Sequence, residues 1–151
     1  MGADSGIHIT TPESTVVEPI SVAHAIKAVI EKNKYDLVIM GKQAIDDDSG
    51  STGGMLAGML GWGQGSFTSK LTVEEGGKVE ITREIDGGLE KLEGKLPMIV
   101  TTDLRWVFRP VGQHEIGADF RLLVRLNGKP YPYETSSELT HVTRTAICLS
   151  T

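Results

Sequence analysis

The chain has 151 residues, of which 39% are hydrophobic and 5% aromatic, so its composition is that of a folded chain with one ordinary core. The formal net charge of -5 at pH 7 argues against nucleic acid or an anionic membrane as the main partner, because basic residues are too few to neutralise phosphates. The single cysteine, Cys148, excludes an internal disulfide framework. No run resembles a signal peptide or a membrane span, so we expect no membrane insertion, and partners that are proteins and small molecules.

The first third of the chain alternates between the patterns of strand and helix. Residues 7–10 alternate apolar and polar, which predicts a short strand, and a polar loop containing Pro19 follows. A helix is expected after Ser21 as its N-cap, because apolar residues then recur at helical spacing as far as Asn33 or Lys34. This order is the beginning of an α/β fold.

A buried strand and a second helix enclose an acidic, glycine-rich loop. The uninterrupted apolar run at residues 37–40 is typical of a parallel strand that is buried on both faces. The next helix, which Gly61 should end, is indicated by apolar residues at helical spacing, Met55, Leu56, Met59 and Leu60. The loop therefore lies at the carboxyl end of a strand, where the amides of the next helix suit a phosphate or a ribose.

Beyond residue 66 the hydrophobic period changes to two. Residues 67–73 and 79–84 flank a turn at Gly76-Gly77 and predict a hairpin, and a strand is expected at 96–102. The acidic excess ends near Arg105, and the pattern after it supports no firm element. We therefore expect a boundary there.

The loop shows no pattern of a metal site or of a catalytic site. Asp46, Asp47 and Asp48 do not fit a calcium loop, because Gly50 stands one position too early and Ala57 occupies the place of the bidentate glutamate. Its hydroxyl residues do not form the glycine-flanked elbow of a nucleophile, and no nearby base supports that role. We expect neither a metal nor a catalytic residue.

Two long sequence segments resemble segments of a known protein family. The run GKQAIDDD at residues 41–48, and ITREIDGGLEKL at 81–92 followed by LPMIVT at 96–101, resemble the beta subunit of electron transfer flavoprotein. The resemblance covers residues 1–105. It implies a Rossmann-like parallel sheet of the adenine nucleotide alpha hydrolase type, with a β-hairpin and meander added. It also implies that the fold is truncated at its N-terminus, and that residues 106–151 are a divergent tail outside this domain.

The resemblance also implies a function. Members of the family pair with an alpha subunit and take electrons from acyl-CoA and related dehydrogenases into an FAD held mainly by that subunit. A quinone oxidoreductase then receives the electrons, in the mitochondrial matrix or, for a bacterial protein, in the cytoplasm. The beta subunit is an electron-carrier subunit rather than an enzyme, and it holds an AMP without a redox role. The residues of this chain that correspond to the AMP loop are Gly41, Lys42, Gln43, Ala44, Ile45, Asp46, Asp47, Asp48, Ser49, Gly50, Ser51 and Thr52.

Two alternatives remain open on the sequence. In the first, the chain is a free-standing adenine-nucleotide-binding α/β domain. Such a domain would have no need of the family segments at residues 81–101. In the second, it is a nonfunctional truncated isoform that folds poorly alone, because the loss of strands exposes apolar faces and unpaired backbone groups.

Overall fold

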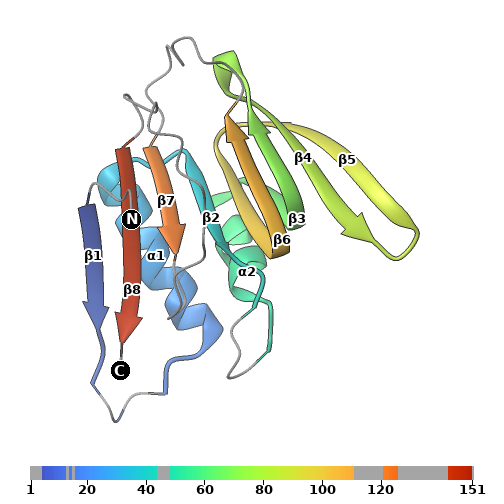
Figure 1. The fold of residues 1–151 in the computed structure, drawn as a ribbon. Coiled ribbons are helices and arrows are strands. Elements are labelled where there is room, and N and C mark those ends of the chain that lie inside the picture. The colour runs from blue at the N-terminus through green and yellow to red at the C-terminus, as the bar shows by residue number, and fades with distance from the viewer. Residues whose placement is uncertain are drawn as a thin grey trace.

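The computed structural model describes residues 5–12, 14, 16–43, 48–110, 121–125 and 143–150. In this part of the chain, one sheet of eight strands carries two α-helices on one of its faces (Figure 1). The elements are β1 (Ser5–Thr10), α1 (Pro19–Asn33), β2 (Leu37–Gly41), α2 (Thr52–Leu60), β3 (Gly63–Val73), a 3₁₀ turn (Glu75–Gly77), β4 (Lys78–Ile85), β5 (Gly88–Lys95), β6 (Met98–Pro110), β7 (Arg121–Arg125) and β8 (Thr143–Ser150). The predicted α/β class is confirmed.

The sheet is parallel except at one side. The strand order is β1-β8-β7-β2-β6-β3-β4-β5, and only the β3–β4 and β4–β5 pairs are antiparallel. The connection through α2 carries the chain from β2 past β6 to β3. The predicted parallel sheet with an added hairpin and meander is therefore confirmed.

Helix α1 begins earlier than the sequence pattern indicated. Its first residue is Pro19 and its N-cap is Glu18, whose carbonyl oxygen accepts the backbone N–H of Ser21 at 2.9 Å. The prediction of Ser21 as the N-cap was therefore wrong, as was the placement of Pro19 in the loop. Proline suits the first turn, because its fixed φ is helical and its missing N–H has no partner there. The end at Asn33 is confirmed, with Lys34 in the left-handed region at φ 55°.

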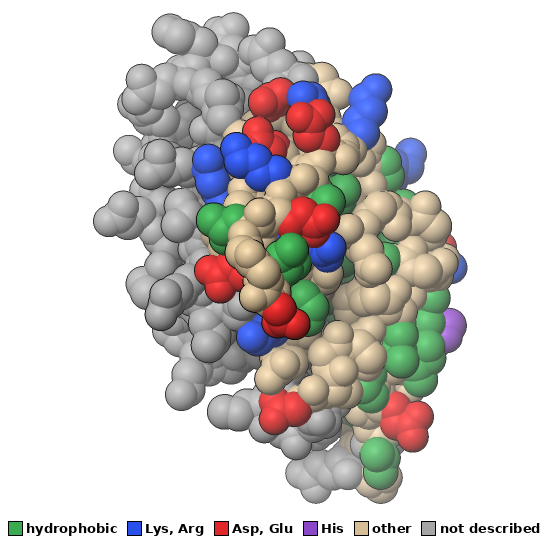
Figure 2. Space-filling view, turned by 90° about the vertical axis from the view of Figure 1, so that its right-hand side faces the viewer, with side chains coloured by type: hydrophobic (Ala, Val, Ile, Leu, Met, Phe, Trp, Pro, Cys, Tyr) green, Lys and Arg blue, Asp and Glu red, His purple; other side chains and the backbone are tan. Residues whose placement is uncertain are grey.

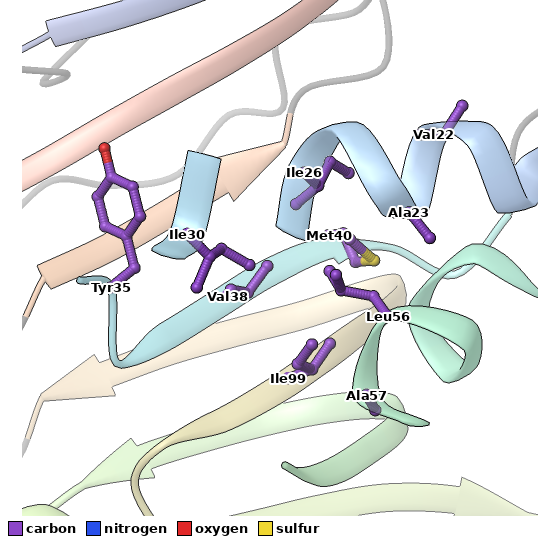
Figure 3. Packing of buried hydrophobic residues seen from close by; sticks show 10 residues of the cluster. All are labelled: Val22, Ala23, Ile26, Ile30, Tyr35, Val38, Met40, Leu56, Ala57 and Ile99. Atoms are coloured by element: carbon purple, nitrogen blue, oxygen red, sulfur yellow. The ribbon is translucent and has the colours of Figure 1, made fainter. Parts of the chain in front are cut away.

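The core between the helices and the sheet fixes both helices against β2 and β6. Figure 3 shows ten residues of this cluster, which come from these four elements and, for Tyr35, from the segment between α1 and β2: Val22, Ala23, Ile26, Ile30, Tyr35, Val38, Met40, Leu56, Ala57 and Ile99. Leu56 is fully buried, whereas Met55 is 38% exposed. Met55 therefore lies outside the core stripe predicted for α2, because this helix turns Leu56 and Ala57 toward the sheet.

A second buried cluster lies apart from the helices and joins β2 and β6 to the β3–β4 hairpin. Buried side chains there come from β2, β6 and the hairpin: Leu37, Ile39, Leu71, Val73, Val79, Ile81, Met98 and Val100. Strand β3 begins at Gly63, four residues before the predicted start. A Cβ at Gly65 would overlap Ile81, so glycine allows these two strands to approach closely.

The C-terminal strands lie within the sheet. Strand β6 continues past Arg105 to Pro110, and β7, where the sequence pattern supported no firm element, pairs with β2. Strand β8 pairs with both β7 and β1. The boundary at Arg105 stays a prediction, and residues 111–120, 126–142 and 151 of the expected tail are outside the described residues.

Candidate functional site

The candidate loop leaves the sheet at the carboxyl end of β2, beside β6. Gly41 is in register with Thr102 of β6, and the backbone N–H of Lys42 donates to the carbonyl oxygen of Thr102 at 3.1 Å. The first helical hydrogen bond of α2 runs from the N–H of Met55 to the oxygen of Ser51 at 3.0 Å. The parallel pairing of β2 and β6 therefore places the start of the loop beside Thr102, and α2 begins directly at its end.

Eight of the twelve predicted loop residues are described by the structure. Ala44, Ile45, Asp46 and Asp47 lie outside the described residues. The side-chain amide of Gln43 donates to Oδ1 of Asp48 at 2.9 Å, and the hydroxyl of Ser51 donates to that of Ser49 at 3.2 Å. The first bond links the start of the loop to its second half, and the second lies near the end of the loop.

The first turn of α2 packs closely on the sheet because Gly53 has no side chain. A Cβ at Gly53 would lie 2.5 Å from Cγ2 of Thr101 and 3.2 Å from the sulfur of Met40. Ser51 is the N-cap residue, but its side chain makes no capping hydrogen bond to the first turn. The backbone N–H groups of this turn can donate hydrogen bonds to an anion.

A hollow lies beside this turn, and we name it the α2 hollow. Its lining residues come from the loop, α2, β3 and β6: Lys42, Gly50, Gly54, Gln64, Gly65, Ser66, Phe67, Ile99 and Thr101. The sequence prediction included Lys42 and Gly50 and missed the strand residues. Those residues lie far along the chain and reach the loop only because β3 pairs with β6, so no local motif could have identified them.

The lining of the α2 hollow combines one cation with hydroxyl and amide groups. Thr101 Oγ1 accepts a hydrogen bond from the backbone N–H of Phe67 at 3.3 Å. The hydroxyl of Ser66 accepts one from Nη1 of Arg83 at 3.3 Å, while Nε of the same arginine lies 2.5 Å from Oε2 of Glu90. Arg83 and Glu90 face each other across β4 and β5 and form an ion pair. This chemistry suits noncovalent binding of a polar, anionic molecule.

Charges of both signs are interspersed on the face shown in Figure 2. Across β4 and β5, Lys78 pairs with Glu93 at 3.3 Å and Lys91 with Glu80 at 3.8 Å. Within the described ranges, no three His, Cys, Asp or Glu residues are grouped so that they could hold a metal. Neither described helix has the length and apolarity needed to cross a membrane.

The comparisons with known proteins decide the family. A family model described as "Electron transfer flavoprotein domain" matches residues 1–119. The chain belongs to the electron transfer flavoprotein family. It is 54% identical over 107 residues to "Electron transfer flavoprotein subunit beta" of Bos taurus, a match that covers 70% of this chain and 42% of that protein. The Homo sapiens protein of the same name gives the same identity and coverage. The Bradyrhizobium diazoefficiens protein is 56% identical over 105 residues, covering 70% of this chain and 41% of its own.

These matches confirm the resemblance to the beta subunits of electron transfer flavoprotein. The match to the family model extends beyond Arg105. The chain spans about 42% of the length of these curated relatives. Related beta subunits occur both in animals and in a bacterium.

Proposed function

We propose that this chain acts as a noncatalytic beta-subunit portion of an electron transfer flavoprotein. This proposal rests on the 54% identity over 107 residues to proteins named as that subunit. The family match at residues 1–119 includes the loop after β2 and the whole β3–β6 region. A general nucleotide-binding domain would need only the loop, so the extent of the match favours the subunit.

In this proposal the chain is a scaffold for a flavin-bearing alpha subunit. Bound FAD would supply the redox chemistry, receiving electrons from acyl-CoA and related dehydrogenases and passing them to a quinone oxidoreductase. The residues of this chain would position the partner and exclude water, and none would make or break a bond. The corresponding location is the mitochondrial matrix in a eukaryote, or the cytoplasm in a bacterium.

We further propose that the loop at residues 41–52 binds AMP as a structural ligand. The first turn of α2 offers backbone N–H groups, the N-cap side chain does not bond to them, and Lys42 lines the hollow beside them. In this arrangement the phosphate would lie at the helix entrance. Thr52 and Asp47 would supply hydrogen bonds to the phosphate or the ribose.

Coexpression tests the subunit role. The 151-residue chain would be produced with a flavoprotein alpha subunit and separated by size exclusion, with absorbance followed at the flavin band. A full-length beta subunit of a relative is the positive control, and the alpha subunit alone is the negative control. Co-elution as a yellow heterodimer supports the proposal. A lone alpha peak beside a folded, monomeric chain that binds AMP would instead favour a free-standing nucleotide-binding domain.

The AMP site is tested by substitution in the same complex. Lys42→Met and Thr52→Val should each weaken AMP binding in calorimetry, because one removes a cation and the other a hydroxyl. Lys32→Met is the matched control, since it makes the same charge change in the last turn of α1. Equal affinities for all three variants and the unmodified chain would contradict the proposed site.

A further inference from the structure

Phe67 has an unusual backbone for an aromatic residue. Its φ is 56°, in the left-handed region that bulky side chains rarely adopt, and it is 49% exposed. It lies where the register between β3 and β6 shifts, between Gly65 and Thr68. Neither core cluster includes it, so burial of its side chain does not offset this conformation.

The residues around Phe67 determine its conformation. Thr68 is fully buried, and its hydroxyl donates to the carbonyl oxygen of Gly65 at 3.4 Å. The backbone N–H of Phe67 itself donates to Oγ1 of Thr101 on the neighbouring strand at 3.3 Å. Strained conformations held in this way are concentrated at ligand-binding sites, because the strain presents a side chain that relaxation would withdraw.

The surroundings of Phe67 indicate which kind of ligand would suit this part of the hollow. Phe67 lines the α2 hollow together with Lys42, Gln64 and Thr101, so an aromatic residue stands beside groups suited to an anion and to hydrogen bonds. A ligand that matches this lining has a flat aromatic part and a negatively charged part. A nucleotide has both.

We propose that the ring of Phe67 stacks on the base of the nucleotide bound at this loop. The inference rests on the proposed AMP site and adds a residue that recognises the base. The phosphate lies toward Lys42 and the first turn of α2, while the base covers the exposed ring. Stacking on an aromatic side chain accepts any base, so Phe67 contributes affinity for a base rather than selection of adenine.

Binding of AMP and of ribose 5-phosphate, which lacks the base, tests this role. Calorimetry would compare the unmodified chain with Phe67→Ala, Phe67→Gly and Phe67→Tyr. We expect the Ala and Gly variants to lose about 5- to 150-fold in AMP affinity. Their affinity for ribose 5-phosphate should not change, and Phe67→Tyr should retain AMP binding. Leu89→Ala, which truncates another exposed apolar residue on β5, is the control and should bind both ligands normally.

Thermal unfolding separates this role from a purely structural one. Glycine adopts positive φ without strain, so Phe67→Gly should raise Tm while it weakens AMP binding. Unchanged AMP affinity in Phe67→Gly, or an equal loss for both ligands, would overturn the stacking role. In the first case the AMP site itself would still stand. Failure of the unmodified chain to bind AMP would overturn the site and the stacking role together.

Discussion

The close packing of α2 on the sheet can be tested with two glycines in the same helix. A Cβ at Gly53 would lie 2.5 Å from Cγ2 of Thr101, whereas a Cβ at Gly58 would meet nothing within 4 Å. Gly53→Ala and Gly58→Ala therefore make the same chemical change with different packing. The difference in stability between the two variants measures how closely the first turn of α2 approaches β6.

The magnitude follows from two opposing terms. Replacement of glycine by alanine in a helix stabilises it by about 0.5–1 kcal/mol, which is the whole effect expected for Gly58→Ala. Overpacking in Gly53→Ala adds a cost of about 1–3 kcal/mol. The two variants should thus differ by about 1–3 kcal/mol, and each kcal/mol should move Tm by about 2–4 °C for a chain of this size.

The assay is equilibrium unfolding of the full chain in urea, monitored by circular dichroism. A double variant adds a second check, because Thr101→Ser removes the methyl group that the new Cβ would meet and keeps the hydroxyl. Gly53→Ala combined with Thr101→Ser should recover most of the lost stability, with a coupling of about 0.5–3 kcal/mol. Equal stability of Gly53→Ala and Gly58→Ala would refute the described packing.

Four further substitutions test the core, the hairpin and the surface charges. Leu56→Ala should cost about 2–5 kcal/mol in urea unfolding because Leu56 is fully buried, whereas Met55→Ala, at a position 38% exposed, should cost less than about 1 kcal/mol. Similar costs for the two would contradict the orientation of α2. Gly65→Ala should lower the free energy of unfolding by about 1–3 kcal/mol, since its Cβ overlaps a buried isoleucine of β4; unchanged stability would argue against that contact. The hydrogen bond and charge of Glu93 raise the pKa of Lys78 above its ordinary value. The stabilisation that the Lys78–Glu93 pair gives the folded state is therefore present below the ordinary pKa of lysine, and it is lost as the pH rises through the raised value. Lys78→Met should make unfolding less dependent on pH above about 10, and an unchanged dependence would exclude the pair as a contributor.

Local chemistry in the sequence determined most of the elements on which the site depends. The apolar run of β2, the helical spacing of α1 and the turn at Gly76-Gly77 each act over a few residues, so their patterns predicted the right type of element. Proline at the start of α1 also acts locally, because its fixed φ suits the first turn, and it starts the helix before Ser21. The family resemblance rested on the same kind of information, because it came from continuous sequence segments. The comparisons confirmed it.

Only the tertiary structure decided which distant residues lie together. Gln64, Phe67 and Thr101 reach the α2 hollow because β6 inserts between β2 and β3. The same pairing places Thr101 beside the first turn of α2. In this position the helix buries Leu56 and leaves Met55 exposed. Strands β7 and β8 likewise join the sheet between β2 and β1 through contacts with residues far away in the sequence. Pairing between distant strands depends on all the competing partners and on the core they enclose, so a local pattern can predict a strand but not its neighbour.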